Sequence, residues 1–105
     1  MEIIINEEKF NVDTANTFWK RLTGLMFKKN IKKGIIFFKT GSIHTFFMLE
    51  KIDVIMLNKD GFVIYYKKNI KKNKIIIKKK AYYTIELPSN SINKLAIGDK
   101  ILFNH

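Results

Sequence analysis

Short stretches of alternating hydrophobic and polar residues run along most of the chain, and this period of two is typical of β-strands with one buried face. The alternation is clearest over residues 81–87, where Tyr83, Ile85 and Leu87 share one face. Residues 34–38 form a continuous apolar run that is too short for a helix, so they predict a fully buried strand. Further short strands are predicted at residues 2–6, 9–12, 43–47, 53–58, 62–67 and 100–103.

Turn-forming residues between these strands indicate how the strands pair. Lys59-Asp60-Gly61 predicts a hairpin between the strands on either side of it, residues 53–58 and 62–67. Thr40-Gly41-Ser42 predicts a second turn, after which residues 43–47 return antiparallel to the strand before it.

One stretch has the periodicity of a helix instead. The apolar positions that recur at helical spacing are Ala15, Phe18, Trp19 and Leu22. They predict an amphipathic helix near residues 14–23 whose apolar stripe packs on the sheet, with Trp19 in the core. Asp13 or Thr14 is the expected N-cap, and Gly24 is expected to end the helix in a left-handed conformation. A single further helical turn is predicted at residues 91–95.

Seven to eight short, mostly antiparallel strands with one early helix predict a mainly β domain, either a small sandwich or a barrel-like fold. A chain of 105 residues is the size of a single domain, residues 1–105. The N-terminus has no basic region of a signal peptide, and no stretch approaches the roughly 20 apolar residues of a membrane-spanning helix. We therefore expect a soluble, cytoplasmic protein without a membrane span.

The amino-acid composition excludes several kinds of functional site. The chain has no cysteine, which excludes disulfides, thiolate metal sites and a cysteine nucleophile. The net charge is +11, and Arg21 is the only arginine among the 20 basic residues. Residues 67–80, from Lys67 to Lys80, contain eight lysines and no acid, which indicates a solvated edge strand or a long loop. Surface charge explains this pattern, so nucleic acid is not the expected partner.

Several fragments of the sequence form an ordered set. They are Arg21 with Gly24-Leu25-Met26, Gly34 with Phe37-Phe38, His44-Thr45-Phe46-Phe47-Met48, Ile52-Asp53-Val54, Asp60-Gly61, Thr84-Ile85-Glu86-Leu87-Pro88 and Gly98-Asp99. In this order and spacing, the chain from about Val12 to Phe103 resembles the bacterial and archaeal family called domain of unknown function 192 (DUF192), in its shorter His-Thr-Phe variant. The resemblance implies a compact, sandwich-like β domain with one helix, and it leaves the function open.

Three charged residues form the first candidate group. Asp53 and Glu86 are flanked by large apolar residues, and buried carboxylates need partners. Arg21 is the obvious bidentate partner. One interpretation is a structural network of ion pairs that ties the helix to the sheet. The other is an arginine presented in a cleft, where the acids orient it to bind a carboxylate or phosphate.

His44 is the only histidine inside the chain, on a predicted strand of large apolar residues. It could form an acid–base pair with Asp53, or a hydrogen-bonded wall of the core. Because the other histidine is the terminal His105, we expect no metal site and no cofactor.

The leading interpretation is a small binding or interaction domain without enzymatic activity. Its candidate site is a cleft that holds a small anion or a peptide, and its candidate residues are Arg21, Gly24, Met26, His44, Met48, Asp53 and Glu86. The methionines could equally be ordinary core filling. Three alternatives stay open: a small enzyme that uses His44 and Asp53, a domain that binds a protein partner, and a binder of anionic polymers through residues 67–80.

Overall fold

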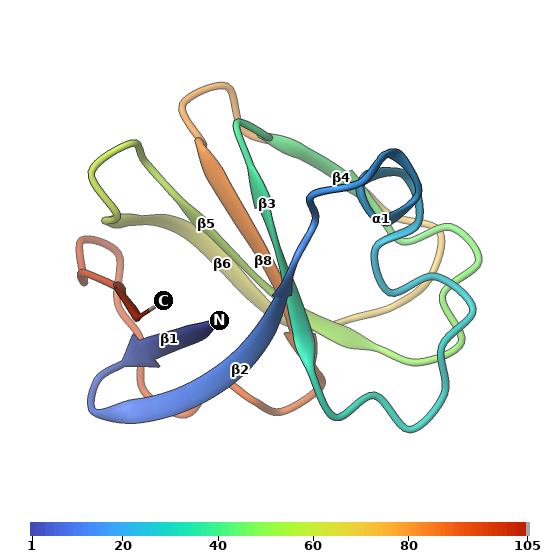
Figure 1. The fold of residues 1–105 in the computed structure, drawn as a ribbon, viewed down its shortest axis with the longest axis horizontal. Helices are drawn as coiled ribbons and strands as arrows, with labels where there is room; N and C mark the ends of the chain where they lie inside the picture. The colour runs from blue at the N-terminus through green and yellow to red at the C-terminus, as the bar shows by residue number, and fades with distance from the viewer. Residues whose placement is uncertain (105) are drawn as a thin grey trace.

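The computed structural model describes residues 1–104 and consists mainly of β-strands (Figure 1). The nine strands are β1 (Glu2–Ile5), β2 (Glu8–Thr14), β3 (Gly34–Phe38), β4 (Ser42–His44), β5 (Ile52–Leu57), β6 (Val63–Ile70), β7 (Ile75–Ile77), β8 (Tyr83–Pro88) and β9 (Leu102–Asn104). The one helix is α1 (Phe18–Thr23). The prediction of a mainly β fold with one short helix is confirmed.

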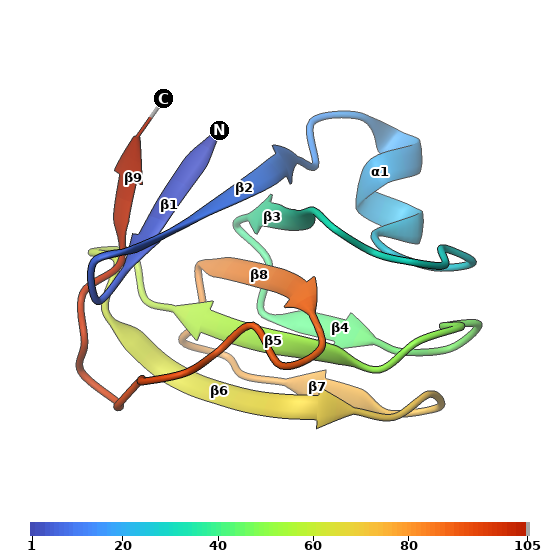
Figure 2. The same ribbon diagram turned by 90° about the horizontal axis from the view of Figure 1, so that it is seen from below.

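Seven strands form one sheet in the order β6-β5-β8-β3-β2-β1-β9, and β4 pairs with β7 in a separate ribbon. Only the β2–β3 pair is parallel; the other strand pairs of the described chain are antiparallel. The large sheet curls into a half-barrel (Figure 2). A bridge between Phe62 and Lys100 joins the segment before β6 to the segment before β9, so the two edges of the sheet approach each other there.

The two faces of the curled sheet carry two hydrophobic clusters. Alternation along β5 explains the division, because Ile55 and Leu57 belong to one cluster while Val54 and Met56 belong to the other. All six residues of β5 are buried. The second cluster also contains Ile43 of β4 and Leu25, which follows α1, so the ribbon and the end of the helical segment cover this face.

Strands β5 and β6 form the predicted hairpin, but the predicted pairing of residues 43–47 with the strand before them is wrong. Strand β4 is shorter than predicted and pairs with β7 instead. The reason is that both edges of β3 are occupied, one by β2 and the other by β8. Residues 67–80 combine the end of edge strand β6, a turn and β7, so the prediction of an edge strand or loop holds in part.

The predicted docking of the helix is also wrong. Strand β2 extends to Thr14, so α1 starts later than predicted and its N-cap is Thr17, whose side chain accepts a hydrogen bond from the Lys20 N–H. No residue of α1 is buried, and Trp19 is 71% exposed instead of lying in the core. Ala15 alone of the predicted stripe is buried, because its N–H extends the β2–β3 pairing by bonding to the Ile36 carbonyl.

Two further points concern the ends of elements. Gly24 ends α1 as predicted and has a positive φ of 51°, but its ψ of −120° lies outside the left-handed helical region; its N–H bonds to the Lys20 carbonyl. Residues 91–95 form no helical turn and belong to an irregular segment before β9.

Within the described residues, no helix is long and apolar enough to cross a membrane.

Candidate functional site

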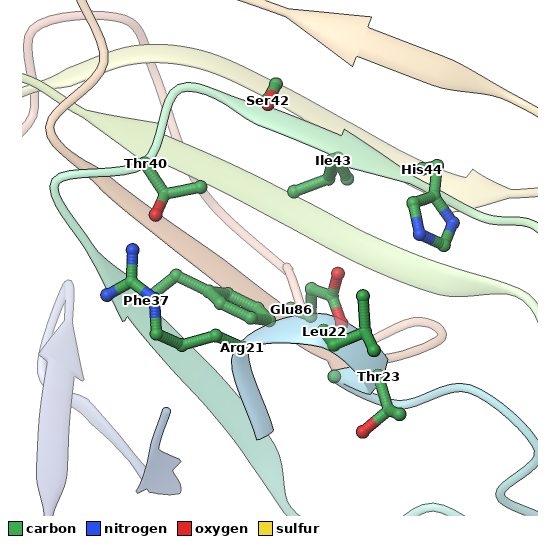
Figure 3. Close-up of a pocket in the computed structure, with 10 residues that line it drawn as sticks. Arg21, Leu22, Thr23, Phe37, Thr40, Ser42, Ile43, His44 and Glu86 are labelled. Atoms are coloured by element: carbon green, nitrogen blue, oxygen red, sulfur yellow. The ribbon is translucent and has the colours of Figure 1, made fainter. Parts of the chain in front are cut away.

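A cleft of about 220 Å³ opens where the end of α1 faces β3, β4 and β8 (Figure 3). Its walls are built from segments far apart in the sequence. The lining residues are Arg21, Leu22, Thr23, Gly24, Phe37, Thr40, Ser42, Ile43, His44 and Glu86. The cleft thus brings together four of the seven predicted site residues: Arg21, Gly24, His44 and Glu86.

Arg21 lies in the last turn of α1 and is exposed. Its Nη1 donates one long hydrogen bond of 3.5 Å to the Phe38 carbonyl. Within residues 1–104 it forms no ion pair; the ion pair found there joins Lys33 and Asp13 at 2.8 Å. In Figure 3 the guanidinium lies on the Thr40 side of the Phe37 ring, while the Glu86 carboxyl lies on the other side. Most of the guanidinium donors are therefore available to a ligand.

Glu86 lies on β8 between the central strands β3 and β5, and only 4% of the residue is exposed. Its Oε1 accepts a hydrogen bond of 3.3 Å from the Leu25 N–H. Gly24 makes this approach possible, because a Cβ at that position would lie 2.8 Å from Oε1. The positive φ and the close carboxyl both require glycine here.

Burial raises the pKa of the Glu86 carboxyl to about 7, and the Leu25 N–H and the charge of Lys28 oppose this shift. One hydrogen bond from an N–H group does not compensate for the hydration free energy that a carboxylate loses when it is buried. No fully buried side-chain polar atom in residues 1–104 lacks a hydrogen-bond partner. Because Oε2 has no partner there, it must contact solvent, and the cleft is where it does so. Near neutral pH this oxygen can donate or accept a hydrogen bond.

His44 ends β4 and forms another part of the cleft wall. Its Nδ1 accepts a hydrogen bond of 3.3 Å from the Phe46 N–H, and its ring stacks on the Phe46 ring at 5.2 Å. An Nδ1 that accepts leaves the proton of a neutral imidazole on Nε2. His44 can therefore act as a hydrogen-bond donor toward a ligand.

Asp53 does not line this cleft. It is completely buried, and its carboxylate accepts hydrogen bonds of 2.8 to 3.3 Å from four backbone N–H groups, those of Asn69, Asn90, Ser91 and Ile92. Alternation along β5 points Asp53 away from the face that carries Val54 and, on the neighbouring strand, Glu86. Asp53 therefore ties the segment after β8 to the β5–β6 hairpin and makes no contact with His44 or Arg21.

Met26 and Met48 are the remaining predicted site residues. Met48 is buried in the hydrophobic cluster beneath the β4–β7 ribbon, and Met26 packs against the same cluster. Both fill the core, and neither lines the cleft. The structure likewise contains no ion-pair network of Arg21, Asp53 and Glu86, since backbone N–H groups bind both carboxylates.

Sequence reasoning missed the rest of the cleft wall, including Phe37, Thr40 and Ser42. The Thr-Gly-Ser stretch was recognisable as a turn, but its position depends on the pairing of Thr40 with β8 and on the crossing of β4 over the sheet. In particular, the Thr84 hydroxyl donates to the Thr40 carbonyl at 2.7 Å. Among residues 1–104, no three histidine or acidic side chains lie close enough together to hold a metal ion.

Comparisons with known proteins agree with the motifs. Residues 1–103 match the DUF192 family, described as "Uncharacterized ACR, COG1430". The chain is 39% identical over 112 residues to the UPF0127 protein TK1120 of Thermococcus kodakarensis, covering 94% of this chain and 71% of that protein. It is 40% identical over 114 residues to the UPF0127 protein PH1112 of Pyrococcus horikoshii, covering 94% and 96%.

The fold is also shared with more distant proteins. The crystal structure of protein R01717 from Sinorhizobium meliloti 1021 matches with a TM-score of 0.80 at 17% identity, covering 96% of this chain and 89% of that one. The match to the family extends through β1, beyond the part of the chain that the motifs cover. The protein belongs to the DUF192 family.

Proposed function

We propose that the protein is a binding domain that holds a small anion, a carboxylate or a phosphate, in the cleft at the end of α1. The observation that carries this proposal is the meeting of Arg21, His44 and the solvent-facing oxygen of Glu86 in one cleft. Arg21 supplies the positive charge and a planar set of donors. His44 and the protonated form of Glu86 add donors from the opposite wall.

The pKa of Glu86 gives the proposal a pH dependence. Below about pH 7 the carboxyl is neutral and can donate to an anion, whereas above about pH 7 it is ionised and repels one. Anion affinity should therefore fall as the pH rises through 7. In the Glu86→Gln variant the amide stays neutral, so this fall should disappear.

Two-dimensional amide spectra of the protein, titrated with acetate, citrate and inorganic phosphate at pH 6 and pH 8, test the proposal. We expect shifts of the amides around Arg21, Gly24 and His44, stronger at pH 6. Arg21→Gln should weaken binding at least about tenfold, because a charge-assisted bidentate contact contributes about 1.5–3 kcal/mol. The control is Lys94→Gln, which removes an equal charge outside the cleft. Equal effects of the two substitutions would show charge attraction without a site.

A specific observation also favours a second candidate, acid–base catalysis in the same cleft. Carboxyls with a pKa near 7 are common among catalytic acids and bases, and Glu86 shares the cleft wall with His44. Glu86, and not the enclosed Asp53, is the carboxyl that could act with His44. Turnover of a bound carboxylate or phosphate ester that is lost in both Glu86→Gln and His44→Gln would favour this candidate over simple binding.

A further inference from the structure

Large apolar side chains protrude from one end of the half-barrel. They come from α1, from the connection between α1 and β3, and from the connection between β4 and β5. Between 51% and 71% of each residue is exposed: Phe18, Trp19, Leu22, Phe27, Phe47 and Leu49. Figures 1 and 2 both place α1 and residues 25–33, 45–51 and 71–74 at this end. We call it the aromatic–lysine end. Exposed apolar patches of this kind mark interaction surfaces.

Contacts between these segments hold the end in one arrangement. The Phe27 N–H bonds to the Phe47 carbonyl at 3.1 Å, and the two rings stack at 5.5 Å. The buried Thr45 joins the neighbouring turn: its hydroxyl donates to the Lys71 carbonyl at 2.7 Å and accepts from the Lys74 N–H at 2.8 Å. The aromatic side chains and the lysines of residues 71–74 therefore belong to one surface.

The charge at this end is almost entirely positive. The segments at this end, α1 and residues 25–33, 45–51 and 71–74, contain ten of the 20 basic residues and a single acid, Glu50. Glu50 and the neighbouring Asp13 are only partly exposed, and both have partners already. Asp13 pairs with Lys33, and Glu50 accepts the N–H groups of Asn30 and Ile31.

Four other acids lie at the opposite end. Glu7, Glu8, Asp60 and Asp99 lie in or beside turns that Figures 1 and 2 place away from α1. Asn6, next to Glu7, donates to the Lys94 carbonyl at 2.7 Å and to the Asp99 carboxylate at 3.3 Å, and so joins two of these segments. The molecule is thus polarised along its length: the aromatic–lysine end has a large excess of positive charge, whereas at the other end these four acids are balanced by Lys9, Lys59, Lys94 and Lys100.

We infer that the aromatic–lysine end docks on the surface of an anionic lipid bilayer. Its rings and leucines would enter the boundary between headgroups and acyl chains, and lysines such as Lys28 and Lys72 would contact lipid phosphates. The opposite end, where acids and lysines balance, would point away from the bilayer, so the uneven distribution of charge sets the orientation. The protein would lie on the membrane and would not cross it.

Three observations favour a bilayer over the other partners of a basic, aromatic surface. Two of the protruding side chains are leucines, which offer no ring face to a nucleic-acid base but suit hydrocarbon. The rings already stack in pairs, Phe18 on Trp19 at 5.6 Å and Phe27 on Phe47, so each has a face less available to bases. A second copy of the chain would oppose two positively charged ends.

Trp19 makes the inference directly testable, because it is the only tryptophan of the chain and lies on this surface. The intact protein is mixed with vesicles of phosphatidylglycerol and phosphatidylcholine in equal parts, and with vesicles of phosphatidylcholine alone. We expect a blue shift of the Trp19 emission with the anionic vesicles, quenching by brominated acyl chains, and weaker binding in added salt. An unchanged emission and no sedimentation with anionic vesicles would overturn the inference.

Matched substitutions at the two ends sharpen the test while leaving the reporter in place. Phe47→Ser should lower the vesicle partition coefficient about tenfold, since it removes an inserted ring. Ile97→Ser is the control, because Ile97 and Phe47 are equally exposed, at 63%, and Ile97 lies in the turn before β9. Lys28→Gln and Lys72→Gln should each lower partitioning about fivefold, and Lys94→Gln should leave it unchanged.

Three outcomes would assign the surface differently and overturn the inference. Equal losses for Phe47→Ser and Ile97→Ser would mean that the aromatic–lysine end is not the docking surface. A blue shift with a single-stranded oligonucleotide, but not with vesicles, would identify a nucleic-acid surface. A shift that grows with protein concentration in the absence of lipid would identify contact between copies. Melting temperatures of the variants close to that of the wild type ensure that folding does not cause the losses.

Discussion

Two buried carboxylates on neighbouring strands have opposite surroundings. Asp53 on β5 accepts four backbone N–H groups, while Glu86 on β8 accepts one from Leu25 and turns its second oxygen to a cleft. Both residues are almost completely buried. The number of donors therefore decides their roles: the fully bonded carboxylate stabilises the fold, whereas the partly bonded one is free to meet a ligand.

Removing the Asp53 carboxylate should have the largest effect on the free energy of unfolding. Asp53→Ala removes the acceptor of four N–H groups, one of them buried and three partly buried, at about 1–3 kcal/mol for each group that water cannot reach. We expect the free energy of unfolding, measured by urea denaturation, to fall by about 4 kcal/mol or more. Asp53→Asn keeps one acceptor oxygen and should lose about half as much. A loss below about 1 kcal/mol for Asp53→Ala would show that these bonds do not stabilise the fold.

Replacing Glu86 should have the opposite effect and make the protein more stable at neutral and higher pH. Glu86 has a pKa of about 7 in the folded protein and an ordinary value of 4.5. Between these pH values the folded state binds a proton that the unfolded state has released, so the stability falls as the pH rises from 4.5 to 7. Glu86→Gln should therefore be about 3 kcal/mol more stable than the wild type at pH 8, and equal to it at pH 4. Urea denaturation at both pH values measures this, and a constant difference would contradict the shifted pKa.

The third test concerns the space that Glu86 occupies. Gly24→Ala places a Cβ 2.8 Å from the Glu86 oxygen and 3.0 Å from the Phe37 ring, at a positive φ. We expect a loss of about 2 kcal/mol in thermal or urea unfolding. Gly98→Ala is the matched control, because Gly98 also has a positive φ but no atom within 4 Å of the added Cβ. Equal losses in the two variants would mean that backbone strain alone is responsible.

The smallest effect on stability should come from Arg21. Its single long hydrogen bond and its exposure predict that Arg21→Gln changes the free energy of unfolding by less than about 0.5 kcal/mol. The same substitution should weaken anion binding, as argued above for the cleft. A large loss of stability in urea would instead assign Arg21 to the support of the fold.

Local patterns were sufficient for much of the fold. Alternation and turn residues predicted the β5–β6 hairpin, because both strands and the turn lie within one short stretch of chain. The docking of α1 could not be predicted in this way. Phe18, Trp19 and Leu22 have the spacing of a buried stripe, but whether a six-residue helix meets the sheet depends on where β2 ends and β3 begins.

The candidate site was only partly predictable for a related reason. The presence of buried acids could be inferred from their apolar neighbours, and Arg21 was the natural partner among the side chains. Backbone N–H groups leave no mark in a sequence, since every residue except proline has one. The donors to Asp53 come from residues 69 and 90–92, which only the folded chain brings to β5.

The bonds of Asp53 have a consequence for hydrogen exchange. The amides of Ser91 and Ile92 lie in an irregular segment, where exchange with solvent is usually fast. Here they bond to a carboxylate on the most enclosed strand of the sheet, so they are released only when β5 itself is exposed. This segment should therefore exchange together with the central strands, as one cooperative unit that extends beyond the regular secondary structure.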